Sequence, residues 1–186
     1  MLAVLILIVL IWLGADRIGG GSHPATATVQ QDVDQQFRTL HPVKARVDSG
    51  TEEPHVAIGS VSIGSRFSAE AFVTTEPGTD GCELVVTVDR RTGGPDGTVG
   101  GCGRWPATGA AMLTVGGAAI GWVSDGSVTS VTVSGNGYQE SARVVAQHFI
   151  VAAPPGAFPG LPLTVTGVAG DGTAVSSWSG TLNEWS

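Results

Sequence analysis

The 186-residue sequence is poor in charge, in tyrosine and in cysteine. Charged residues make up 13% of the chain, and the formal net charge is -7. Lys44 is the single lysine, and among the arginines that follow it only Arg90 and Arg91 are adjacent. Phosphate binding requires clustered positive charge, so the sequence argues against a nucleic acid partner. A lysine–asparagine crosslink within a β domain is also unexpected, because Lys44 precedes the β-rich region.

Hydrophobic residues and glycine are abundant instead. The chain is 42% hydrophobic and contains 28 glycines and 10 prolines, together with many valines, threonines and serines. This apolar content is sufficient to build a core. The composition favours short strands joined by tight turns, so we expect an all-β fold.

The N-terminus begins with an apolar run, Leu2 to Leu13, which predicts a membrane anchor or signal segment over residues 1–18. A spanning helix needs roughly 20 apolar residues, more than the run supplies. A signal peptide would show a basic stretch before the run and a cleavage site soon after it, but Ala25-Thr26-Ala27 lies far downstream. A buried core helix is the remaining alternative.

We favour an anchor whose basic cytoplasmic flank lies upstream of Met1. Arg17 after the run opposes this orientation under the positive-inside rule, whereas the cysteines favour an extracytoplasmic domain. The expected location is therefore the cell membrane, with a single membrane pass and an extracytoplasmic C-terminal domain. A secreted protein is the alternative if the segment is cleaved.

A flexible linker is predicted over residues 19–27, followed by an amphipathic helix over residues 28–41. Thr28 and Gln31 match a capping box, and Pro42 ends the helix. One apolar stripe follows the helix, formed by Val29, Val33, Phe37 and Leu40. In the simplest interpretation the stripe packs on the β domain; the alternatives are self-association and docking on a membrane partner.

The β domain is predicted over residues 55–186. Strands are expected at 56–63, 67–75, 82–89, 127–134, 138–145, 149–153, 161–168 and 173–179. A turn-rich loop is expected at 92–101, and the apolar sequence at 112–122 is broken by Gly116, Gly117 and Gly121. Residues 56–63 are expected to alternate strictly between two faces. Asn136-Gly137 is the strongest hairpin signal. This pattern predicts an antiparallel immunoglobulin-like β-sandwich, with a closed barrel as the alternative.

The two cysteines lie within this domain. Cys82 begins a predicted strand, and Cys102 ends the glycine-rich loop that follows it. In an exported protein they are most simply a disulfide, which would close a loop of about twenty residues and stabilise the fold by roughly 3 kcal/mol. Two cysteines without a nearby histidine supply too few ligands for a metal, and we expect neither a metal nor a cofactor.

Several short motifs resemble uncharacterised envelope β domains of GC-rich Gram-positive bacteria. They are Gly100-Gly101-Cys102-Gly103 after a cysteine-led strand, the stretch from Ala119 to Val128, and Leu163 to Thr166 before Gly170-Asp171-Gly172. The resemblance extends over roughly Val56 to Val175. It implies an envelope compartment and a β fold, and it implies no activity and no site residue.

No catalytic set is apparent. A Gly-x-Ser-x-Gly elbow is absent, and of the four histidines only His148, within a predicted strand, is placed as a catalytic base would be. We therefore expect no enzyme.

Tryptophans are the remaining candidates for a binding site: Trp105, Trp122, Trp178 and Trp185. Large aromatic residues usually build the core, whereas an exposed pair would stack on a glycan or anchor a protein partner. We expect an extracytoplasmic, non-enzymatic interaction module that binds a protein partner in the cell envelope. Binding of cell-wall glycan through these tryptophans is the alternative.

Overall fold

The computed structural model of the protein describes residues 27–40, 55–74, 80–157 and 160–182. The predicted anchor at residues 1–18, the linker up to Thr26 and the candidate residue Trp185 lie outside these ranges. Within them, no helix combines the length and the apolar character needed to cross a bilayer.

The described ranges contain helix α2 (Ala27–Leu40) and three antiparallel sheets. The first, here the meander sheet, has the order β1 (His55–Ile63), β2 (Phe67–Thr74), β3 (Asp80–Asp89) and β4 (Gly94–Arg104). The second, the middle sheet, has the order β5 (Ala110–Val115), β6 (Ala118–Val123) and β9 (His148–Ala152). The third, the outer sheet, has the order β11 (Ala174–Thr181), β10 (Pro162–Ala169), β7 (Val128–Gly135) and β8 (Tyr138–Arg143).

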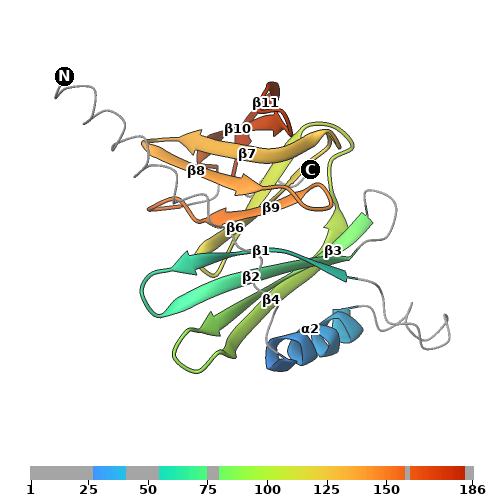
Figure 1. Cartoon of the computed structure of the whole chain (residues 1–186), viewed down its shortest axis with the longest axis vertical. Coiled ribbons are helices and arrows are strands. Elements are labelled where there is room, and N and C mark those ends of the chain that lie inside the picture. Colours follow the sequence, from blue (N-terminus) through green and yellow to red (C-terminus); the bar gives the residue numbers. More distant parts are fainter. Residues whose placement is uncertain (1–26, 41–54, 75–79, 158–159, 183–186) are drawn as a thin grey trace, which may run out of the picture.

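The helix and the three sheets form four successive layers (Figure 1). Val29 and Val33 of α2 are fully buried in a cluster with Phe72 and Leu84, on one face of the meander sheet. The described part of the helical stripe therefore packs on the β domain, in agreement with the simplest interpretation. The side chains of Phe37 and Leu40 lie outside the described residues.

The middle sheet is buried on both faces. Every residue of β6 is buried, because one face packs on the meander sheet and the other on the outer sheet. Such strands read as continuous apolar runs rather than as alternating patterns. The predicted all-β fold is confirmed, and the stacking of open sheets is sandwich-like rather than that of a closed barrel.

Tight turns connect most neighbouring strands. Asn136 and Gly137 both have positive φ angles, 51° and 77°, as a type I′ turn requires. The predicted hairpin between β7 and β8 is thereby confirmed. Gly116 and Gly117, with φ angles of 55° and 88°, make the equivalent turn between β5 and β6, so the apolar sequence that these glycines interrupt forms two strands.

The loop predicted at residues 92–101 is wrong, because β4 occupies most of it. Its sequence lacks alternating apolar residues, and its order comes from pairing with β3 along its whole length. The structure has eleven strands in the described ranges, more than the sequence predicts. An edge strand with one neighbour and few packed side chains leaves little hydrophobic signal.

Cys82 and Cys102 form a disulfide with an Sγ–Sγ distance of 2.06 Å, which confirms the predicted pairing. Their surroundings differ from the expectation. The two residues lie directly opposite each other on β3 and β4, rather than at the two ends of a loop. Cys82 is buried beneath α2, and Cys102 is exposed.

Strand β1 contains a β-bulge. The pairing register with β2 shifts between Ala57 and Gly59, so Ile58 is an extra residue. The bulge reverses the face of all later side chains, which allows Ile58 and Val61 to join the same core cluster. The strict alternation predicted for this strand is therefore wrong.

Candidate binding groove

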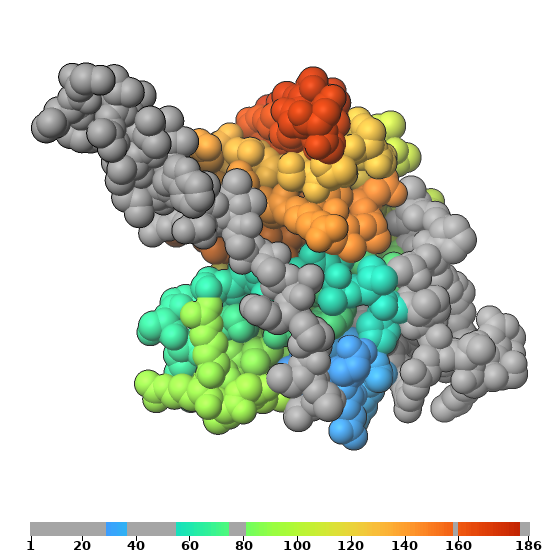
Figure 2. Space-filling model, in the orientation of Figure 1, coloured from blue at the N-terminus to red at the C-terminus, as the bar shows by residue number. Residues whose placement is uncertain are grey.

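One edge strand from each sheet lies along the same side of the molecule. These strands are β1, β9 and β8, and together with β7 they line a groove of about 720 Å³. Figure 2 shows the surfaces of β1 and of the β8–β9 region next to each other on the viewed face.

Apolar residues form the floor of the groove. Ile150 and Val151 of β9 are buried there, and Ile58 of β1 packs in the same cluster as Ile150. A Cβ atom added to Gly59 would lie 3.3 Å from Cγ2 of Ile150. The absence of a side chain at Gly59 therefore lets the β1 backbone approach β9 closely.

Hydroxyl groups and one charge of each sign line the walls. The hydroxyl-bearing lining residues are Ser60, Ser62, Ser130, Thr132 and Ser141. Glu140 and Arg143, both on β8 and both exposed, supply the charges. The Oγ atoms of Thr132 and Ser141 are 3.1 Å apart and hydrogen-bond across β7 and β8.

Tyr138 joins β8, which forms one wall of the groove, to β9, which forms its floor. Its hydroxyl donates a 2.6 Å hydrogen bond to the carbonyl oxygen of Ala152, so β8 is held on β9. Burial, and then the negative charge of Glu140, raise the pKa of Tyr138. The phenol is therefore protonated and remains a donor at physiological pH. Tyr138, Glu140 and Ala142 alternate onto the same face of β8.

The predicted candidate tryptophans lie elsewhere. Trp105 and Trp122 are 3% and 7% exposed, and their rings stack with centroids 6.2 Å apart. In this structure neither ring presents a face to a glycan. They belong to the boundary between the meander and middle sheets, which agrees with the core interpretation of aromatic residues.

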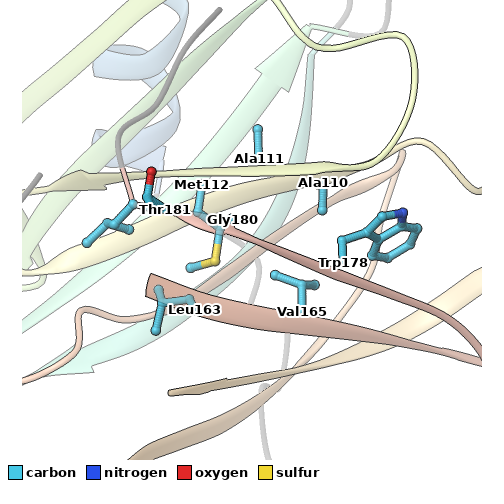
Figure 3. Close-up of a pocket in the computed structure, with 9 residues that line it drawn as sticks. Ala110, Ala111, Met112, Leu163, Val165, Trp178, Gly180 and Thr181 are labelled. Carbon is cyan, nitrogen blue, oxygen red and sulfur yellow. The ribbon is translucent and has the colours of Figure 1, made fainter. Parts of the chain in front are cut away.

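Trp178 is half-buried at the opposite side of the outer sheet. Figure 3 shows its indole at one end of a small apolar pocket between β5 and the β10–β11 pair, near Val165 and Ala110. The pocket has a volume of about 30 Å³, which suits roughly one or two water molecules and no sugar ring. The indole also covers Gly109 and Gly167, whose added Cβ atoms would lie 3.7 and 3.3 Å from it.

His148, the predicted candidate for a catalytic base, is 8% exposed on β9. Its Nδ1 donates to the carbonyl oxygen of Ala146 at 2.6 Å, and its ring packs edge-on against Trp105 at 5.2 Å. Burial lowers the pKa of His148, so the ring is neutral at pH 7. Within the described part of the chain, neither a serine nor a carboxylate bonds to the imidazole.

Glu83 is a buried carboxyl group that sequence reasoning did not single out. It lies next to Cys82 on β3, is 6% exposed, and its Oε2 atom has no hydrogen-bond partner among the described residues. Burial raises the pKa of Glu83 to about 7. The only sequence signal is an acidic residue within a run of apolar strand residues.

The other carboxylates of interest stabilise turns. Asp89 accepts hydrogen bonds from Arg66 at 2.7 and 3.0 Å, which lower the pKa of Asp89. Asp125 and Asp171 accept bonds from residues two positions later, and these bonds lower both pKa values. No cluster of three or more metal-ligating side chains exists in the described ranges.

Comparison with known proteins adds no relative: neither a family model nor a curated protein matches the chain.

Proposed function

We propose that this chain is a non-enzymatic interaction module, tethered to the membrane by Leu2–Leu13, whose extracytoplasmic β domain binds a protein partner of the cell envelope. The groove between β1, β8 and β9 is the observation that carries this proposal. Its volume of about 720 Å³ falls within the range of roughly 300–1,000 Å³ that is typical of ligand sites.

The chemistry of the groove favours an extended polar segment of polypeptide. Serine and threonine hydroxyls donate and accept hydrogen bonds, so they match peptide groups of either polarity. Glu140 and Arg143 would pair with opposite charges on the segment and fix its direction. The bulge in β1 and the charge of Glu140 interrupt regular strand pairing, so recognition relies on side-chain contacts.

The proposed location outside the cytoplasm is supported by the disulfide between Cys82 and Cys102. Structural disulfides persist in oxidising compartments and are rare in the cytosol. The likeness of the turn and strand motifs to envelope domains of GC-rich Gram-positive bacteria agrees with this location. We further propose an immunoglobulin-like relationship for the middle and outer sheets, between which the chain alternates from β5 to β11.

Glycan binding through tryptophan is the weaker proposal. Trp105 and Trp122 are buried, and the pocket beside Trp178 is too small for a sugar ring. The described residues that line the groove include no aromatic side chain, whereas sugar recognition commonly uses a flat apolar ring on which to stack. A protein segment is therefore favoured over a glycan.

A capture experiment with defined probes tests the proposed function. The full chain, immobilised with its disulfide intact, is incubated either with a peptide digest of host envelope proteins or with cell-wall polysaccharide. We expect retention of a small set of related peptides and no retention of polysaccharide. A synthetic copy of a retained peptide then gives the affinity by isothermal titration calorimetry.

Two substitutions make the experiment specific to the groove. Glu140→Trp on β8 places a large ring in the groove and should abolish retention, because Glu140 lines the groove and is exposed. Ser177→Trp on the exposed face of β11 is the matched control and should bind like the natural chain. Equal retention by both variants, or retention of polysaccharide alone, would exclude the proposed function.

A further inference from the structure

An arginine of the meander sheet reaches one end of the groove. Arg90 lies in the turn between β3 and β4, is exposed, and donates a hydrogen bond from Nη2 to the Oγ atom of Ser62. Ser62 lines the groove on the β1 wall. The backbone N–H of Arg90 also donates to the carbonyl oxygen of Arg66 at 2.9 Å, which holds this turn beside the turn between β1 and β2. Arg90 therefore extends the β1 wall of the groove.

Neighbouring contacts show which end of the groove this is. A Cβ atom added to Gly117 would lie 2.8 Å from Cγ2 of Ile63, the residue after Ser62. The carbonyl oxygen of Gly117 accepts a 3.0 Å hydrogen bond from the N–H of Ala153, which directly follows β9. Tyr138, the first residue of β8, is bonded to the last residue of β9. The arginine therefore lies at the end of the groove where β8 begins.

A second arginine lies at the opposite end. Arg143 is the last residue of β8, lines the groove and is exposed. On the facing wall, the lining residues of β1 extend from Ile58 to Ser62, a length of about 13 Å in an extended strand. The groove therefore has one guanidinium group at each end.

The charge around the groove is opposite in sign to that of the whole chain, whose formal net charge is -7. Among the described residues that line the groove or bond to its wall, the two arginines Arg90 and Arg143 exceed the single carboxylate of Glu140. The nearby Arg66 is neutralised by its hydrogen bonds to Asp89, at 2.7 and 3.0 Å. A concave surface with excess positive charge attracts an acidic partner and disfavours a basic one.

We propose that the groove selects an acidic segment of polypeptide, in which two carboxylates about four residues apart contact Arg90 and Arg143. Residues four apart in an extended segment face the same side and span about 13 Å, which matches the length of the β1 wall. A guanidinium group stays charged and binds a carboxylate through two parallel N–H bonds. This specificity rests on the function proposed above, because it concerns the same groove.

Sequencing the captured peptides separates this specificity from binding itself. The full chain, with its disulfide intact, retains peptides from the digest of envelope proteins. We expect the retained set to be enriched in pairs of acidic residues four positions apart, and a synthetic copy to bind several-fold more weakly in about 0.5 M salt, because exposed charges are screened. Retention of related peptides without acidic residues would overturn the specificity and leave the proposed function intact. Retention of no peptide would overturn both.

Charge reversal at each end tests the two arginines. Arg90→Glu and Arg143→Glu should each bind the synthetic peptide roughly tenfold more weakly in isothermal titration calorimetry, because an attraction becomes a repulsion. Arg91→Glu is the matched control: it makes the same change at the next exposed residue, which does not line the groove, and it should bind like the natural chain. Thermal melting checks that every variant is folded. Equal affinities of Arg90→Glu and Arg91→Glu, or of Arg143→Glu and the natural chain, would overturn the inference.

Discussion

The two faces of the middle sheet are buried in different ways. The face toward the outer sheet packs in a large apolar cluster, and the ring of Phe149 occupies the space above Gly121, where an added Cβ would lie 2.2 Å from the ring. The face toward the meander sheet has the same apolar centre, but Glu83 and His148 lie in its neighbourhood. The first interface therefore depends on apolar packing together with the hydrogen bond from Tyr138 to Ala152, whereas the second also depends on protonation.

The distribution of buried polar groups supports this difference. Among the described residues, the buried polar or charged side chains are Thr74, Glu83, Asp89 and His148. Three belong to the meander sheet and one to the middle sheet, and none belongs to the outer sheet. The comparison predicts that substitutions at the two interfaces differ in size and in pH dependence.

The largest effect is expected at the apolar interface. Phe149→Ala removes a fully buried ring and should lower the free energy of unfolding by about 3–5 kcal/mol. The loss should be the same at pH 5 and pH 8, because Tyr138, the titratable side chain packed against this cluster, keeps its proton throughout this range. Urea denaturation at the two pH values measures it. A loss that changes with pH would contradict the proposed difference between the two interfaces.

Glu83→Gln tests the other interface. The pKa of Glu83 is about 7 in the folded protein and 4.5 in the reference state. Because the folded pKa is raised, the stability that the protonated group contributes is complete below pH 4.5 and is lost as pH rises through 7. The amide does not ionise. As pH rises from 4.5 through 7, the free energy of unfolding of the variant should therefore increase by about 3 kcal/mol relative to that of the natural chain.

The measurement for Glu83 is a series of urea denaturation curves from pH 4 to pH 8. Glu140→Gln, an exposed glutamate on β8, is the matched control and should show no comparable gain. If the difference between Glu83→Gln and the natural chain is constant across the series, Glu83 ionises normally in the folded protein and the proposed polar character of this interface is wrong.

His148→Phe should have the smallest effect and the opposite pH dependence. Burial lowers the pKa of His148 in the natural chain from 6.5. The stability that the neutral ring contributes is therefore complete above pH 6.5 and is lost as pH falls through the folded pKa. Phenylalanine keeps the contact with Trp105 and loses the bond to Ala146, which costs about 1 kcal/mol at pH 7. Thermal melts should show this deficit shrinking in acid; a deficit that grows would contradict the assignment.

Local sequence signals predicted the features that depend on a few neighbouring residues. Asn136-Gly137 gave the correct hairpin, because only certain residues adopt two successive positive φ angles easily. The disulfide was predicted from two cysteines and the expected compartment. Gly121 illustrates the limit: in the sequence it interrupts an apolar stretch, yet in the structure it makes space for Phe149 within a continuous strand.

Features that depend on distant segments were not predictable. The groove combines residues 58–62, 130–132, 140–143 and 150–152, four short segments that carry no common motif. β4 has no hydrophobic pattern in its sequence, and its hydrogen bonds to β3 are what define it as a strand. The bulge at Ile58 also reflects the fit of β1 to the middle sheet, and its own sequence equally supports a regular strand.

Photocrosslinking in the native host tests the binding role of the groove most directly. A photoreactive phenylalanine analogue replaces Ser141 in the groove or, as a control, Ser177 on the exposed face of β11. We predict that the analogue at position 141 crosslinks to one contiguous segment of an envelope protein, that a synthetic peptide of that segment competes, and that the analogue at position 177 does not crosslink to it. Crosslinks of equal yield from both positions, or none from Ser141, would contradict it.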